Sequence, residues 1–117
     1  MVEGVRNINE AVKNGWKIRA FLCKEGKLSQ WAEELIATIK TKENYCFSKE
    51  LMEELSGKED VSELMAIVER KDISLDEVKT SEKPFFVLFD RPSNKGNLGS
   101  IIRSCDALGV DGLIMTG

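Results

Sequence analysis

The chain has 117 residues, 42% hydrophobic and 32% charged, with a net charge of −3 and no histidine. This length suits one ordinary domain, or one small domain with part of another, and the composition is that of a soluble globular protein. No apolar run approaches the ~20 residues of a membrane-spanning helix and the first residues carry no export signal, so we exclude a membrane protein and expect a cytoplasmic one.

The three cysteines, Cys23, Cys46 and Cys105, lie far apart in the sequence. Without histidine they form no zinc motif, so we expect no metal site and interpret them as small buried side chains. The usual histidine base and nucleophile partner are also missing, so any catalysis depends on other residues.

Helical spacing of apolar residues, closed by Asn-Gly, predicts a first helix from Val5 to Lys13, and Lys17 to Cys23 is predicted as a strand. A broad apolar stripe from Leu28 to Ile39 predicts a second helix, with Ser29 as its cap and Trp31 in the core.

Three more elements complete the first region. They are a strand at Tyr45 to Phe47, a helix capped by Ser48 that runs to Leu55 and stops at Gly57, and a strand at Leu64 to Val68. The alternation of strands and helices predicts a small α/β domain over residues 1 to 70. The polar residues 71 to 84, which close with Pro84, are predicted to be a linker.

A second α/β region is predicted from residue 85 to residue 117. The apolar run Phe85 to Phe89 indicates a strand covered on both faces, and Leu113 to Met115 begins the next strand. Between them we expect a loop from Asp90 to Asn97 and an amphipathic helix that is stopped by Gly109. This is a βαβ unit, and two strands with one helix cannot cover both faces. We therefore expect the region to pack on the first domain, pair with another copy, or belong to a longer polypeptide.

The loop after the first strand of a parallel sheet is a common ligand site, and here it leads into Asn97. We interpret Asn97 as the N-cap, with backbone N–H groups left for an anion such as phosphate. Gly99, Arg103 and Ala107 are spaced by four and share one helix face, so Gly99 leaves room beside the guanidinium. The spacing indicates an anion or phosphate site; an ordinary cap with a surface arginine is the alternative.

Basic residues are concentrated at the start of the chain, where residues 1 to 30 hold six Lys or Arg against three acids, while residues 51 to 79 hold four against nine. A polyanion would approach the basic region, and its candidate contacts are Arg6, Lys13, Lys17 and Arg19. Solubilising surface charge is the alternative interpretation of these residues.

The pattern Asn97-x-Gly99-x-x-x-Arg103-x-x-x-Ala107-x-Gly109, after the strand Phe85 to Asp90, resembles the first motif of the SpoU (TrmH-like) branch of the SPOUT RNA methyltransferases. Val2 to Arg6, Leu51 to Gly57 and Leu64 to Val68 resemble the small α/β substrate-binding domain that often precedes the catalytic domain. The resemblance implies an α/β fold class: this small domain, followed by the first βαβ unit of a knotted methyltransferase domain.

The resemblance also implies an activity, the transfer of a methyl group from S-adenosylmethionine to a ribose 2′-hydroxyl of tRNA or rRNA. It gives catalytic positions to Asn97 and Arg103, and substrate contacts to Gly99 and Ser100. In the family the cofactor pocket is a knot made by later motifs, which residues 1 to 117 do not contain. We therefore expect this chain alone to bind no cofactor and to be inactive, and expect a homodimer for the complete enzyme.

Two other functions are compatible with these residues. The first is a stand-alone RNA-binding or interaction module that keeps the fold without catalysis. The second is a nucleotide-binding α/β protein unrelated to RNA, although the Gly-x-Gly-x-x-Gly and Walker patterns are both absent.

Overall fold

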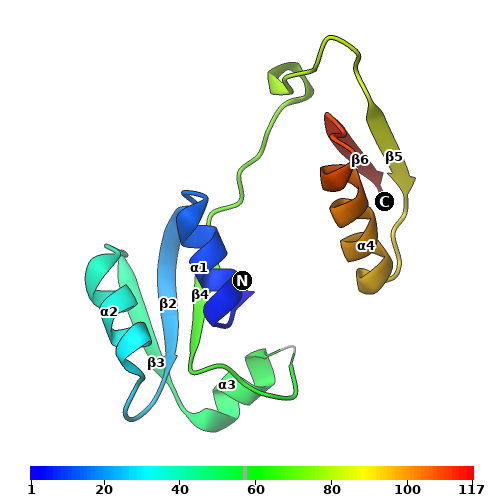
Figure 1. Cartoon of the computed structure of the whole chain (residues 1–117). Helices are drawn as coiled ribbons and strands as arrows, with labels where there is room; N and C mark the ends of the chain where they lie inside the picture. The colour runs from blue at the N-terminus through cyan, green and yellow to red at the C-terminus, as the bar shows by residue number, and fades with distance from the viewer. Residues whose placement is uncertain (57) are drawn as a thin grey trace. The chain divides into compact units, whose positions relative to one another are not determined.

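The computed structural model describes residues 1–56 and 58–117. The chain divides into two compact units, Met1–Lys71 and Asp72–Gly117, which we call unit 1 and unit 2 (Figure 1). In the part of the chain that the structure describes, no helix combines the length and apolarity needed to cross a bilayer.

Unit 1 is built on a four-stranded mixed sheet with strand order β1-β4-β2-β3. The strands are β1 (Val2–Glu3), β2 (Ile18–Lys24), β3 (Glu43–Phe47) and β4 (Leu64–Val68). β2 and β3 are parallel, whereas β4 runs antiparallel to both β2 and β1. The two-residue strand β1 was not predicted, because so short a segment carries no periodicity.

Helices cover both faces of this sheet. They are α1 (Val5–Lys13), α2 (Gln30–Thr38) and α3 (Lys49–Leu55). Phe21 packs with Ile8 of α1 and Ala32 of α2, while the next residue, Leu22, packs with Met52 of α3. Successive side chains of a strand point to opposite faces, so α1 and α2 share one face and α3 covers the other.

Local sequence explains where the helices begin and end. The predicted bounds of α1 are confirmed, and Ser29 caps α2 by accepting the backbone N–H of Ala32. Ser48 caps α3 as predicted, while the predicted stop at Gly57 lies outside the described residues. Trp31 is half-buried against the core, and its indole N–H donates to Asn9 at 3.0 Å.

The prediction that all three cysteines are buried is wrong. Cys46 is exposed, and Cys23 and Cys105 are half-buried. Cys46 lies on β3, which is an edge strand of the sheet and has mostly exposed residues. Edge position, which short apolar runs do not reveal, therefore decides its exposure.

Unit 2 contains the predicted βαβ arrangement. It consists of β5 (Phe86–Asp90), α4 (Lys95–Ala107) and β6 (Gly112–Thr116), with β5 and β6 parallel. Phe86 pairs with Gly112, and a Cβ on Gly112 would lie 2.7 Å from the Phe86 ring, so the glycine makes room for the aromatic side chain. Phe86 and Leu88 remain 41% and 67% exposed, so the expected cover on both faces of this strand is absent from the unit.

The start of β5 is held by one carboxylate. Asp111 accepts the backbone N–H groups of Ser81 and Phe85, both at 2.8 Å, and the Ser81 hydroxyl at 2.9 Å. Residues 72–84, most of the predicted linker, therefore group with unit 2 and include the short 3-10 helix Leu75–Glu77.

We expect Asp111→Asn to destabilise unit 2, because an amide replaces one of the two accepting oxygens by a donor. The backbone N–H of Phe85, followed by Ser81, lowers the pKa of Asp111 below its ordinary 3.8. A carboxylate with a lowered pKa in the folded state stabilises above about pH 3.8, and this contribution is lost as the pH falls through the folded value. Amide hydrogen exchange of β5 at pH 7 should be faster in Asp111→Asn than in the original chain. The exposed control, Glu82→Gln, should exchange like the original. Equal protection of β5 in the original chain and both variants would contradict this role of Asp111.

Candidate functional site

The candidate site lies where β5 ends and α4 begins, at the carboxyl edge of the parallel strand pair. The Arg91 N–H donates to the carbonyl of Thr116 at 3.1 Å, which ties the loop to the end of β6. Arg91 has a φ of 44°, the left-handed region, where a non-glycine residue costs about 1–2 kcal/mol. Such strain is concentrated at functional sites, where surrounding contacts hold it in place.

Asn94, and not Asn97, caps α4. The Asn94 Oδ1 atom accepts the N–H groups of Gly96 at 2.8 Å and Asn97 at 3.1 Å. Gly96 permits this approach, because a Cβ there would lie 3.1 Å from the same oxygen. Asn97 therefore lies inside the first turn, and the prediction that it caps the helix is wrong.

This correction changes the chemistry expected of the helix start. The predicted phosphate site relied on free N–H groups in the first turn, but Asn94 already accepts two of them and the Leu98 N–H donates to the Asn94 carbonyl. Binding of an anion at this helix start must therefore depend largely on side chains.

Arg103 supplies the side chain that the site needs. Its Nη2 atom lies 3.4 Å from the Ser100 hydroxyl, and a Cβ on Gly99 would lie 3.8 Å from Nη1. The guanidinium thus lies over Gly99 and Ser100, as the spacing predicts. Arg103 is exposed and makes no ion pair among the described residues, so its charge is available to an anionic ligand.

Asn97 is also exposed on α4, one turn before Ser100. Within residues 1–56 and 58–117 its side chain makes no hydrogen bond. An amide offers both donors and an acceptor, so Asn97 can contact a hydroxyl, a base edge or a phosphate. The structure therefore brings together Gly99, Ser100 and Arg103 on α4, and places Asn97 on the same helix one turn before Ser100.

The other predicted substrate contacts lie on unit 1. Lys17 and Arg19 both pair with Glu69, at 3.2 and 2.7 Å. The hydrogen bond from Arg19, followed by that from Lys17, lowers the pKa of Glu69 below its ordinary value. Arg6 lies in the first turn of α1, whereas Lys17 follows the last turn of that helix. Arg6 is therefore at the opposite end of α1 from Lys17.

The residues present do not fit S-adenosylmethionine as a complete site. A hollow of about 510 Å³ at the carboxyl edge is lined by Arg91, Pro92, Leu98, Met115, Thr116 and Gly117. Its lining residues are all exposed or half-exposed, and its hydroxyl group, on Thr116, already donates to Asp90. The hollow is therefore open to solvent and does not by itself enclose a nucleoside. In the described part of the chain, no group of acidic and cysteine side chains is arranged to hold a metal ion.

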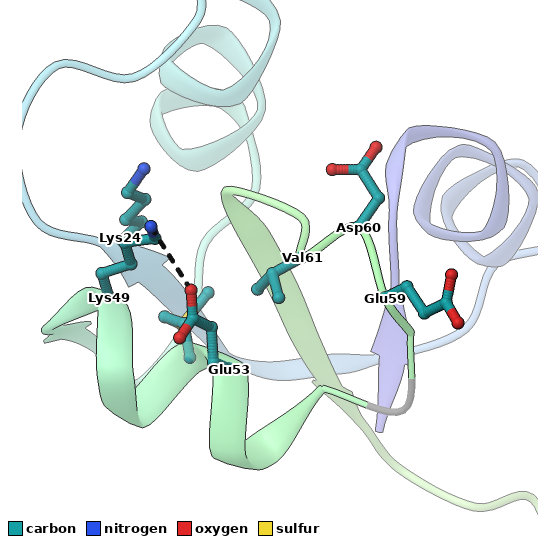
Figure 2. Close-up of a pocket in the computed structure, with 7 residues that line it drawn as sticks. Lys24, Lys49, Glu53, Glu59, Asp60 and Val61 are labelled. Carbon is teal, nitrogen blue, oxygen red and sulfur yellow. Dashed lines mark ion pairs between the residues drawn. The ribbon is translucent and has the colours of Figure 1, made fainter.

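A separate pocket of about 300 Å³ lies on unit 1 between β2, α3 and the segment before β4. Figure 2 shows Lys24 and Lys49 on one side of it and Glu59 and Asp60 on the other, with Lys49 paired to Glu53 at 3.5 Å. None of the predicted site residues lines this pocket. Its mixed charges, including three carboxylates, do not favour a polyanion.

Replacing Gly99 with alanine is expected to stabilise α4 by about 0.5–1 kcal/mol, because glycine weakens a helix interior and the new methyl group meets only the end of Arg103. Amide hydrogen exchange of α4 measures this gain. Gly96→Ala is the matched control, since its methyl group would press on the Asn94 cap and cancel the benefit. Equal stabilisation by both changes would contradict the capping geometry.

Comparison with known proteins extends over both units. The family model described as "SpoU L30e-like domain" matches residues 1–66. A 23S rRNA (uridine(2479)-2′-O)-methyltransferase of Streptomyces viridochromogenes is 44% identical over 119 residues, which cover the whole chain and 41% of that relative. The chain thus spans less than half of this curated relative.

Solved structures agree with this match. The SpoU methyltransferase AviRb of Streptomyces viridochromogenes, in complex with AdoMet, has a TM-score of 0.85 at 46% identity, covering 99% of the present chain and 44% of AviRb. An AdoMet-bound rRNA methyltransferase of Sinorhizobium meliloti has a TM-score of 0.70 at 26% identity, over 98% of this chain and 42% of its own. The α/β fold is thus that of the amino-terminal portion of a SPOUT methyltransferase. With its L30e-like domain in residues 1–66, the chain belongs to the SpoU family.

Proposed function

We propose that the chain is the amino-terminal portion of an RNA ribose 2′-O-methyltransferase that uses S-adenosylmethionine, acts on rRNA and works in the cytoplasm as a homodimer. Residues 1–70 bind RNA, residues 71–84 connect the domains, and residues 85–117 begin the methyltransferase domain. The observation that carries this proposal is the exposed Arg103 guanidinium, which makes no ion pair among the described residues and lies over Gly99 and Ser100 at the edge where β5 ends.

In this proposal Arg103 positions the target nucleotide. Arginine stays protonated at any physiological pH, so it acts as a fixed cation at the ribose or its phosphate and not as a free base. A cation at that place stabilises the negative charge that develops on the 2′-oxygen. Ser100 holds the guanidinium in place, and Asn97 offers its amide to the same nucleotide.

Gly99 keeps space open beside this cation for the ribose. The Gly99→Ala change that stabilises α4 is therefore expected to lower methyl transfer, since its methyl group would stand 3.8 Å from Nη1. Opposite effects on stability and activity would distinguish a substrate role of Gly99 from a purely structural one.

The cofactor half of the site is assigned to segments outside this chain. We expect the chain alone neither to bind S-adenosylmethionine measurably nor to methylate RNA. Isothermal calorimetry that gives ordinary micromolar binding to the isolated chain would overturn this assignment.

A chimaera tests the proposed function. In it, residues 1–117 replace the 119 matched residues of the Streptomyces viridochromogenes relative. We expect the chimaera to transfer labelled methyl groups to rRNA. Mass spectrometry of the rRNA then identifies the methylated nucleotide. A chimaera that folds and binds the cofactor but transfers nothing would favour the alternative, a non-catalytic RNA-binding module.

A further inference from the structure

One end of unit 1 gathers basic side chains that are far apart in the sequence. We call it the basic end, and it comprises Lys13, Lys17, Arg19, Lys40, Lys42, Arg70 and Lys71. In Figure 1 it is the upper end of the unit, where α1, α2 and β4 finish and where β2 and β3 begin. The parallel pairing of β2 and β3 is what brings the later lysines beside the earlier ones.

Hydrogen bonds to backbone carbonyls fix this assembly. The Lys42 N–H donates to the Arg19 carbonyl at 3.3 Å, and the Glu69 N–H donates to the Lys17 carbonyl at 2.8 Å. The Lys71 ammonium donates to the Asn14 carbonyl at 3.4 Å, at the end of α1. Three separate segments are therefore held beside the start of β2.

An exposed aromatic side chain lies in the same place. Trp16 stands between α1 and β2 and is 39% exposed, with the Lys71 ammonium 5.4 Å from its ring centre. Trp31, by contrast, packs against the core and donates its indole N–H to Asn9. Cations at helix ends are explained by the helix dipole, but an exposed tryptophan among them is not.

The acidic side chains are distributed differently. The basic end also contains Glu10, Glu43 and Glu69, of which Glu69 is already paired with Lys17 and Arg19. The opposite end, around the pocket of Figure 2, contains Glu53, Glu59 and Asp60. One end of unit 1 therefore attracts a polyanion, although the chain as a whole is acidic.

Resting on the proposed function and deepening it, we propose that the basic end binds an unpaired segment of the RNA, with a base stacked on Trp16. Lys17, Lys42 and Lys71 hold the flanking phosphates. An aromatic platform within a basic surface is the combination that recognises single strands, because every base offers a face to stack while duplex bases are already stacked.

Glu69 competes with the RNA in this arrangement. Its carboxylate forms ion pairs with the Arg19 guanidinium at 2.7 Å and the Lys17 ammonium at 3.2 Å. A phosphate that binds either cation must displace it. Glu69→Gln is therefore expected to raise RNA affinity several-fold, by removing one negative charge.

The test measures binding of a labelled single-stranded RNA 12-mer and of its duplex to the present chain by fluorescence anisotropy. We expect preference for the single strand, a roughly tenfold loss in Trp16→Ala and recovery in Trp16→Phe. Lys42→Ala with Lys71→Ala should lower the slope of log affinity against log salt by about 1.4, or 0.7 per lost phosphate contact. The matched control, Lys24→Ala with Lys49→Ala at the opposite end, should bind like the original.

A second readout uses tryptophan fluorescence in a Trp31→Phe background, where Trp16 is the remaining indole. Stacking should quench it when single-stranded RNA is added. RNA binding that is unaffected by the Trp16 and lysine changes would overturn this inference and leave the proposed function standing. A chain that binds no RNA would overturn both this inference and the proposed function. A chimaera that still binds RNA at the basic end but transfers no methyl group would overturn the proposed function alone.

Discussion

In the chimaera, Arg103→Ala is expected to lower methyl transfer ~10²- to 10³-fold while the affinity for S-adenosylmethionine stays within about twofold. The guanidinium is exposed over Gly99 and Ser100, and in our proposal it faces the RNA. Removing it should therefore remove a cation from the target nucleotide without touching the cofactor. Rates are measured by incorporation of labelled methyl groups and affinities by calorimetry.

Arg103→Lys is the informative companion to this change. A lysine keeps the charge but lacks the planar, forked donors of the guanidinium, so we expect only partial recovery. Full activity in Arg103→Ala would contradict the assigned role. Loss of cofactor binding in both variants would indicate that Arg103 supports the fold or the cofactor and not the RNA.

Phe21→Ala is expected to lower the free energy of unfolding of unit 1 by about 3–5 kcal/mol. Phe21 is fully buried on β2 and packs with Ile8 of α1 and Ala32 of α2, so its removal leaves a cavity in the core. A loss of this size is a large part of the stability of a small domain. Chemical denaturation followed by the fluorescence of Trp31, which packs against the same cluster, measures it.

Leu51→Ala is the matched control, because Leu51 on α3 is 48% exposed. Its loss should shift the free energy of unfolding by less than about 1 kcal/mol. Similar losses in the two variants would contradict the placement of the core between the sheet and the helices α1 and α2.

Prediction from the sequence succeeded where a pattern is local. The apolar spacing from Val5 to Lys13 gave α1, and Ser29 gave the cap of α2. It failed at the start of α4, where Asn94-Lys95-Gly96 and Asn97-Leu98-Gly99 repeat the same Asn-x-Gly pattern. The first apolar residue, Leu98, favoured the second copy, but the helix extends one polar turn further towards the amino terminus.

The basic end shows what a sequence alone cannot give. Lys13, Lys17 and Arg19 were identified as candidate contacts, but Lys42 and Lys71 were not. Their proximity depends on the parallel pairing of β2 with β3 and the antiparallel pairing of β2 with β4. Trp16 was missed for the same reason, because its exposure beside Lys71 depends on where β4 ends.

The central claim is that α4 presents its Gly99 and Arg103 face to the nucleotide that is methylated. Lys95 is exposed one turn before Gly99 on that face, so a photocrosslinking amino acid at position 95 of the chimaera tests the claim most directly. We predict a crosslink to rRNA at, or next to, the nucleotide that the unmodified chimaera methylates. Crosslinks only to distant nucleotides, or none despite undiminished RNA binding, would contradict it.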